Sequence, residues 1–184
     1  MHGDTKDAPL HRSERKEHPD PGLWAVYLRD HLTGAAAGTA LMRRIARAHR
    51  GAPEEPRLRR LAQETREDQR SLRACMAQLG VRPSRGRIAL GLLAERAGRL
   101  KRNGRVLRRS PLSDVVELEA MRMGVEGKAA CWRALGTLAR TDPRLDPDHL
   151  DHLVRRARRQ ARTLEAVRSD CVARLAVDGG PVTA

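Results

Sequence analysis

Apolar residues recur at alternating intervals of three and four along four long stretches of this chain, and turn-forming Pro and Gly residues separate the stretches. This interval places the apolar side chains on one face of an α-helix, and such a face is normally buried against other helices. Aromatic residues make up only 2% of the chain, so Leu, Ala, Val, Met and Ile must fill the core. Such a composition favours helix-on-helix packing over sheet. The pattern therefore predicts an all-α four-helix bundle.

The ends of the expected helices coincide with residues that favour helix termini. An Asp-Pro pair opens the first helix and another opens the last, Ser113 or Asp114 caps the third, and Gly80 follows the second. The expected ranges are 21–49, 54–79, 114–140 and 146–177.

One long connection and two polar ends complete the expected organisation. Residues 1–20 and 178–184 are polar and lack helical periodicity, so we expect disordered tails around a single domain over 21–177. Residues 81–112 are too many for a hairpin and suit a crossover along the whole bundle, with a short helix over 85–102. One long connection between two short ones makes the helices on either side of the crossover parallel.

The sequence gives no indication of export, membrane insertion or disulfide bonding. The first twenty residues have no apolar signal-peptide core, and no run of about eighteen apolar residues occurs. Cys75, Cys131 and Cys171 lie far apart without Cys-x-x-Cys spacing, which indicates reduced thiols packed in the core. We therefore expect a cytoplasmic protein without a membrane span.

Positive charge is concentrated in the crossover. The chain has a formal net charge of +14, and residues 81–112 carry ten basic side chains against one acid, which leaves +9 there. This clustering favours a polyanion as partner, either duplex nucleic acid or an acidic protein, because aromatic platforms for single strands are nearly absent. The alternative is an arginine-rich solvated face that reflects coding bias. The expected binding residues are Arg99, Lys101, Arg102, Arg105, Arg108 and Arg109.

Polar residues interrupt the apolar faces at one common level. Glu126 and Gln160 each stand about seventeen residues from the turn near 143, so the helical rise puts them side by side. Glu64, Asp68 and His31 stand about thirteen to twenty residues from the turn near 51. We therefore predict one polar layer across the middle of the bundle.

With this layer and the long crossover, the chain resembles the ferritin-like superfamily, in particular its bundles in which a basic crossover joins two helical hairpins. The resemblance covers residues 22–177 and rests on the order and direction of the helices and on the common height of the polar residues. Di-iron members of that superfamily use a carboxylate on each of two helices and Glu-x-x-His on each of the other two. The resemblance thus implies a metal site in the polar layer, and its candidate ligands are His31, Glu64, Asp68 and Glu126.

The chain departs from the di-iron pattern on three helices, and the first of them offers His31 or Asp30 where a Glu would be expected. Glu64-Thr-Arg-Glu67 has Glu where His belongs, and Gln160-Ala-Arg-Thr163 lacks both ligands. Such a set does not build the usual two-iron centre, although it suits a single iron, manganese or zinc ion in substoichiometric amount. The alternative is a set of hydrogen-bonded polar pairs that fix helix register and bind nothing.

Three functions remain open from the sequence. The first is a non-catalytic ferritin-like bundle with a decayed metal site and a structural or interaction role. The second is a metal-binding oxidase of the di-iron type or an iron-handling protein. The third is polyanion binding through the basic crossover. Association into a homo-oligomer is compatible with all three.

Overall fold

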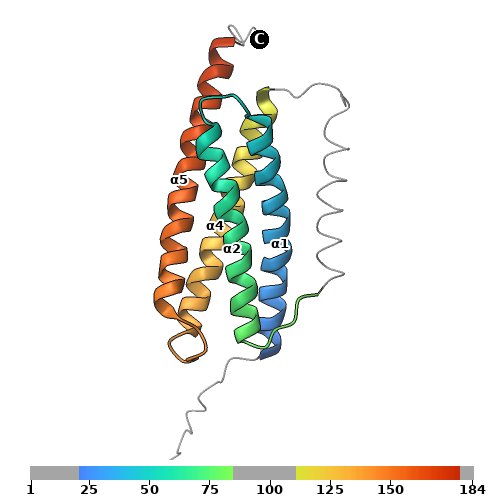
Figure 1. Ribbon diagram of the computed structural model, residues 1–184, viewed down its shortest axis with the longest axis vertical. Coiled ribbons are helices and arrows are strands. Elements are labelled where there is room, and N and C mark those ends of the chain that lie inside the picture. Colours follow the sequence, from blue (N-terminus) through green and yellow to red (C-terminus); the bar gives the residue numbers. More distant parts are fainter. Residues whose placement is uncertain (1–20, 85–110, 179–184) are drawn as a thin grey trace, which may run out of the picture.

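The computed structural model describes residues 21–84 and 111–178. Within these ranges the chain forms four helices and no strand, which confirms the all-α prediction (Figure 1). Residues 1–20 and 179–184 of the two predicted tails lie outside the described residues, and so do the short helix and most of the crossover, whereas Asp178, the first residue of the predicted C-terminal tail, is the last residue of α5. The helices are α1 (Pro21–Ala48), α2 (Glu55–Gln78), α4 (Pro111–Leu138) and α5 (Pro147–Asp178).

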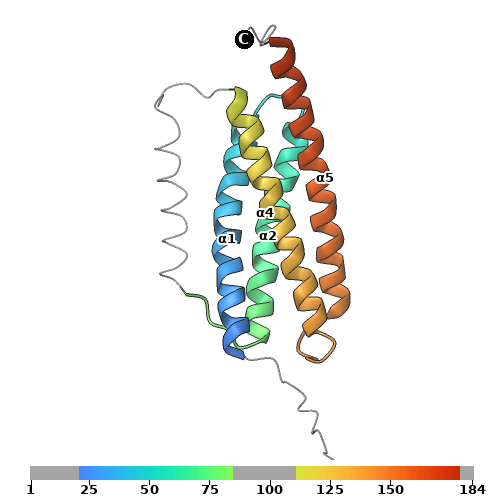
Figure 2. The same cartoon turned by 180° about the vertical axis from the view of Figure 1, so that it is seen from behind.

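The four helices stand side by side, and each packs against two antiparallel neighbours. Helix α1 contacts α2 and α4, and α5 contacts the same two helices, so α2 and α4 lie diagonally across the bundle (Figures 1 and 2). Figure 1 shows α2 and α4 running in the same direction, as expected for two hairpins joined by one long connection. The α2–α5 pair makes the fewest close backbone contacts of the four neighbouring pairs.

The helix ends follow local sequence, with one shift from the predicted boundaries. Asp146 accepts hydrogen bonds from the backbone N–H groups of Asp148 and His149 at 2.9 and 3.2 Å, which caps α5. Gly80 ends α2 with a φ of +73°, a conformation that favours glycine. Helix α4 begins at Pro111, earlier than the predicted residue 114, because proline fits the first turn of a helix without losing a hydrogen bond.

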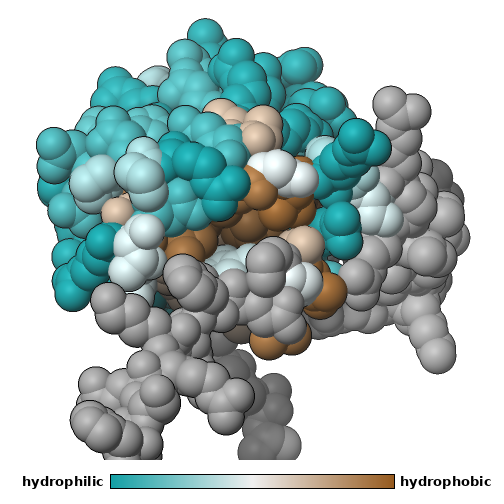
Figure 3. Space-filling view, turned by 90° about the horizontal axis from the view of Figure 1, so that it is seen from below, coloured by the Kyte–Doolittle hydropathy of each residue, from teal (hydrophilic) through white to brown (hydrophobic). Residues whose placement is uncertain are grey.

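The apolar faces meet along the bundle axis and form one continuous core. The predicted inward residues of α4 and α5 are buried along both helices, from Leu118 to Leu135 and from Leu150 to Cys171. Viewed from the end where α1 begins, hydrophobic residues lie towards the middle and hydrophilic ones around them (Figure 3). None of the helices in the described ranges is long and apolar enough to cross a membrane.

Candidate functional site

Three acidic residues of α2 form one wall of a polar region in the middle of the bundle. Thr65 and Asp68 interrupt the buried face of α2, and Asp68 is only 3% exposed. Glu64 and Glu67 directly precede Thr65 and Asp68 on the same helix and are partly buried. A carboxylate as deeply buried as Asp68 needs charged or hydrogen-bonding partners, because desolvation strongly disfavours an isolated charge.

Lys128 of α4 supplies the nearest partner. Its Nζ atom donates to Asp68 Oδ2 at 2.5 Å and to Gln160 Oε1 at 2.6 Å, and its side chain is 16% exposed. Burial lowers the pKa of Lys128, and the attraction of Asp68 opposes this shift. The ammonium group therefore lies between α2 and α5, largely out of contact with bulk water.

Helix α5 completes the polar region with Arg156 and Gln160. Gln160, which is 1% exposed, donates through Nε2 to Glu64 at 2.9 Å and to Asp68 at 3.1 Å. Arg156 donates to Asp68 and, at 3.3 Å, to Glu67. We call this group the Lys128 cluster, and its members are Glu64, Glu67, Asp68, Lys128, Arg156 and Gln160.

The Lys128 cluster holds together the two neighbouring helices whose backbones make the fewest close contacts. Its long side chains bridge α2 and α5 at mid-height, and ion pairs lie nearer the α1–α2 turn, from Arg57 to Asp170 at 3.2 Å and from Arg174 to Glu54 at 2.7 Å. With all groups ionised, three carboxylates face two cations in the cluster. The cluster therefore carries a formal charge of −1 and attracts a further cation only weakly.

The prediction that Glu126 belongs to this layer was wrong in orientation. Its side chain is exposed, whereas Val125 and Ala129 are buried. Each residue turns the helix by about 100°, so the repeat that directs Val125 into the core directs Glu126 to solvent. Counting residues along the axis gave its level correctly but not its direction. Lys128 enters the layer from α4 instead.

His31 lies beside the Lys128 cluster rather than within it. Its ring packs against Tyr27 with the centroids 4.5 Å apart, and burial lowers its pKa. His31, Asp68 and Lys128 line one small cavity of about 50 Å³. A space of this size accommodates water or a single ion, whereas pockets for organic ligands measure about 300–1,000 Å³. The predicted ligands His31, Glu64 and Asp68 thus lie in one region, without Glu126.

The residues predicted to bind a polyanion, from Arg99 to Arg109, lie outside the described residues. Arginines also gather within the described ranges, along an open groove of about 460 Å³ between α1 and α2. Its one acid, Glu55, already accepts hydrogen bonds from Arg59 at 3.0 Å and from the Gly51 N–H at 2.8 Å. We call this the arginine groove, and its basic residues are Arg43, Arg47, Arg50, Arg59 and Arg66.

The three thiols are free and buried, as predicted for structural cysteines. Burial raises the pKa of Cys131 to about 12 and also raises the pKa of Cys75 and Cys171. Since the thiolate is the nucleophilic form, these environments suppress reactivity at neutral pH.

Sequence reasoning missed Lys128 and Arg156, although Lys128 left a signal. The chain has 37 basic residues, four of them lysines, and Lys128 is the one lysine in the four long predicted helices. Lysine carries a compact charge on a flexible stem, whereas arginine presents a planar fork, so this lysine on an otherwise arginine-bearing set of helices differs from its basic neighbours in a way that the sequence displays.

Comparison of the chain with protein-family models, curated proteins and solved structures gives no match. The class of the protein is therefore defined by its fold and its site. Over residues 21–84 and 111–178 it is an all-α four-helix bundle with a largely buried ion-pair layer at mid-height.

Proposed function

We propose that this chain is a non-catalytic bundle of the ferritin-like type, in which the Lys128 ammonium takes the place of a metal ion, and that its role is structural or in binding a partner. The observation that carries the proposal is the pair of short contacts from Lys128 Nζ to Asp68 and Gln160. A ferritin-like protein would place a cation among the inward polar side chains of the four helices. Here the cation is part of the chain.

The electrostatics of the Lys128 cluster support this reading. A divalent ion needs several ionised oxygen ligands, but Asp68 already binds Lys128 and Arg156, and Glu67 pairs with Arg156. A metal ion bound here would lie close to the positive groups of Lys128 and Arg156, and Coulomb repulsion between neighbouring cations is severe in a poorly solvated site. Asp68, the most deeply buried of the predicted ligands, therefore already has two cationic partners, and Glu64 accepts a hydrogen bond from Gln160.

The surroundings of the cluster also argue against a reaction site. The adjoining cavity of about 50 Å³ is too small for an organic substrate. The neighbouring thiol of Cys131, whose pKa is raised to about 12, is protonated at neutral pH. A charged layer of this kind can fix the relative positions of helices, because its hydrogen bonds and ion pairs form in only one register.

Metal analysis of untagged protein tests the proposal, with Glu64→Ala as the informative variant. Glu64 accepts one hydrogen bond from Gln160, so its truncation should leave the fold intact. We expect iron, manganese and zinc contents to be equal in the wild type, in Glu64→Ala and in the surface control Glu126→Ala. Two irons per chain that disappear in Glu64→Ala would overturn the proposal and make an oxidase or iron-handling activity the leading function.

A second candidate function, polyanion binding, is favoured by the arginine groove. Its basic residues come from two adjacent helices and the turn between them, and they face one already paired acid. A concave surface of one charge sign attracts phosphate more strongly than the same charge spread over the molecule.

Heparin or duplex DNA binding as a function of salt tests this second candidate. Each phosphate contact contributes about 0.9 to the slope of log K against log salt, so Arg43→Gln, Arg47→Gln and Arg50→Gln together should flatten the slope by about 3. The matched control replaces three exposed arginines of α5, Arg155, Arg158 and Arg159. Equal losses in both triple variants would indicate diffuse attraction by net charge, and no binding in the wild type would eliminate this function.

A further inference from the structure

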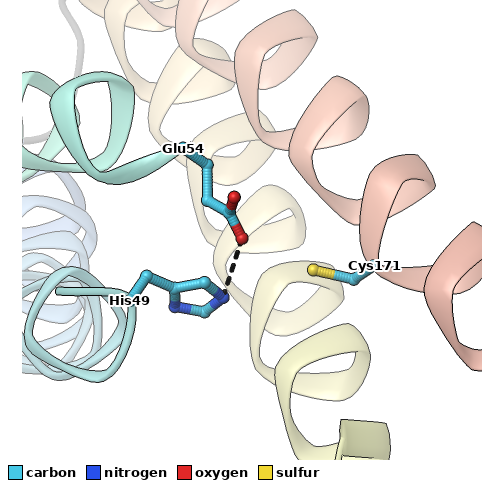
Figure 4. Close-up of side chains that lie close together, drawn as sticks. All are labelled: His49, Glu54 and Cys171. Carbon is cyan, nitrogen blue, oxygen red and sulfur yellow. Dashed lines mark ion pairs between the residues drawn. The ribbon is translucent and has the colours of Figure 1, made fainter. Parts of the chain in front are cut away.

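Three potential metal ligands meet at the end of the bundle where α1 passes into α2. His49 follows α1, Glu54 precedes α2 and Cys171 lies on α5, and the three are 6%, 2% and 4% exposed. One ligand atom from each lies within 4.8 Å of the other two. Figure 4 shows the three side chains pointing towards one another from separate segments. We call this group the His49 cluster.

The imidazole of His49 is arranged as in a metal-binding histidine. Its Nδ1 atom lies 3.0 Å from the backbone oxygen of Ile45, so Nδ1 carries the proton and donates it. Nε2 then has a free lone pair, and it is a buried atom without a hydrogen-bond partner. A backbone carbonyl that accepts from one ring nitrogen is the usual means of orienting the other nitrogen towards a metal.

We propose that His49 Nε2, a Glu54 carboxylate oxygen and Cys171 Sγ bind one zinc ion. Nitrogen, sulfur and oxygen are the three donor types of zinc, with bond lengths of about 2.0–2.3 Å, so donors in a tetrahedral site lie about 3.3–3.8 Å apart. His49 Nε2 and Glu54 Oε1 are already 3.8 Å apart. Small side-chain movements close the remaining gaps.

Asp114 of α4 is positioned to complete the coordination. Its Oδ1 atom lies 4.0 Å from His49 Nε2. Asp114 belongs to α4, the one helix that neither contains nor borders in sequence any of the other three ligands. With Asp114 as the fourth ligand, the zinc ion would connect α4 and α5 to both ends of the α1–α2 turn. Four protein ligands without an open position are typical of structural rather than catalytic zinc. The zinc ion therefore acts as a cross-link between the two helical hairpins.

Arg174 competes with zinc for the same ligands. Its Nη2 atom lies 2.7 Å from Glu54 Oε1 and 3.1 Å from Cys171 Sγ, whereas its side chain is 51% exposed. When zinc binds, the Cys171 thiol loses its proton to water, and the guanidinium moves out to solvent as the ion takes over both contacts. The bound ion is then neutralised by the Cys171 thiolate and the Glu54 carboxylate without the arginine, and Asp114 as the fourth ligand adds one negative charge.

Cobalt titration of the reduced, metal-stripped, untagged chain tests this inference, because Co²⁺ occupies zinc sites and a bound thiolate gives it a charge-transfer absorption band. We expect one Co²⁺ per chain with this band, displaced by Zn²⁺. Cys171→Ser should abolish the band, and His49→Gln should weaken binding beyond the roughly 10–100-fold lost when only a ligand's supporting partner is removed. Cys75→Ser and Cys131→Ser are the matched controls and should keep the band.

Arg174→Met gives an independent result in the opposite direction, since removing the competing cation should raise the affinity for Co²⁺ at least about tenfold. The inference is overturned if the wild type shows no thiolate band at about 1 mM Co²⁺, or if Cys171→Ser keeps it. Circular dichroism of each variant confirms that its helices are intact. Zinc in this site is retained in Glu64→Ala and lost in Cys171→Ser, so this inference and the proposed function fail independently.

Discussion

Replacing Lys128 with methionine should destabilise the bundle, because Asp68 would stay buried with one cation fewer. Methionine has a similar length and no charge, so it removes the contacts to Asp68 and Gln160 without opening a large cavity. Breaking a buried ion pair on one side costs about 3–5 kcal/mol. Asp68 keeps Arg156, and the burial cost that lowers the pKa of Lys128 disappears. We therefore expect a loss of about 2–3 kcal/mol.

Urea unfolding followed by circular dichroism measures this loss, and a double-mutant cycle with Asp68→Asn assigns it to the pair. Each single variant strands a partner, whereas the double variant removes both charges, so its cost should fall short of the sum by more than about 1 kcal/mol. Lys128→Met with the stability of the wild type, together with additive effects, would refute the reasoning. It would mean that water solvates Lys128 and that Asp68 does not depend on it.

Three further outcomes are expected from the same unfolding assay. Glu126→Ala should change the free energy of unfolding by less than about 0.5 kcal/mol, because the side chain is exposed, and a larger loss would return Glu126 to the polar layer. Asp146→Ala should cost about 1 kcal/mol through the loss of two N-terminal hydrogen bonds of α5, and no loss would show that the cap is dispensable. Burial raises the pKa of Cys131 from 9.0 to about 12, so with rising pH the thiol ionises in the unfolded chain before it does in the folded one, and the free energy of unfolding falls above pH 9. Between about pH 9 and pH 10 the wild type should lose about 1 kcal/mol more than Cys131→Ala. Parallel plots of the free energy of unfolding against pH for the two proteins would contradict the shift.

The regular parts of this fold could be predicted from the sequence because they follow from helical periodicity alone. The interval of three and four identified Leu118, Val125 and Trp132 as inward residues of α4, and all three are buried. The same interval placed Asp68 and Gln160 inside, and the two are hydrogen-bonded to each other. The sequence thus indicated which level of the bundle is polar.

The composition of the polar layer could not be predicted from level alone. Glu126 and Lys128 differ by only two residues in height, but helical rotation directs the first to solvent, while the long stem of the second reaches inward. Glu126 was expected in the layer because it stands at the same height as Gln160, about seventeen residues from the turn near 143. At that height the chain instead places Lys128, whose ammonium group contacts Asp68 and Gln160. A cation in place of a carboxylate favours an internal ion pair over a metal site.

The His49 cluster was missed because its members belong to separate segments and to no short motif. Its residues were assigned to the end of a helix, the start of another and a core position. Comparing helix lengths would have brought Glu54 and Cys171 together, since α2 has 24 residues and Cys171 stands 24 residues after the start of α5. Two antiparallel helices of matched rise bring Cys171 level with the start of α2, where Glu54 lies.

The central claim, that the Lys128 ammonium occupies the place of a metal ion, is tested most directly by removing the ammonium and offering a metal in its place. The experiment follows thermal unfolding at increasing Mn²⁺ for two proteins, one with Lys128→Ala and one that keeps Lys128. Both carry Cys171→Ser, which disables the His49 cluster. We expect Mn²⁺ to stabilise the Lys128→Ala protein, by about 3 kcal/mol at a hundredfold excess over its Kd, and to leave the Lys128 protein unchanged. Equal responses of the two proteins to Mn²⁺, or no response in either, would contradict the claim.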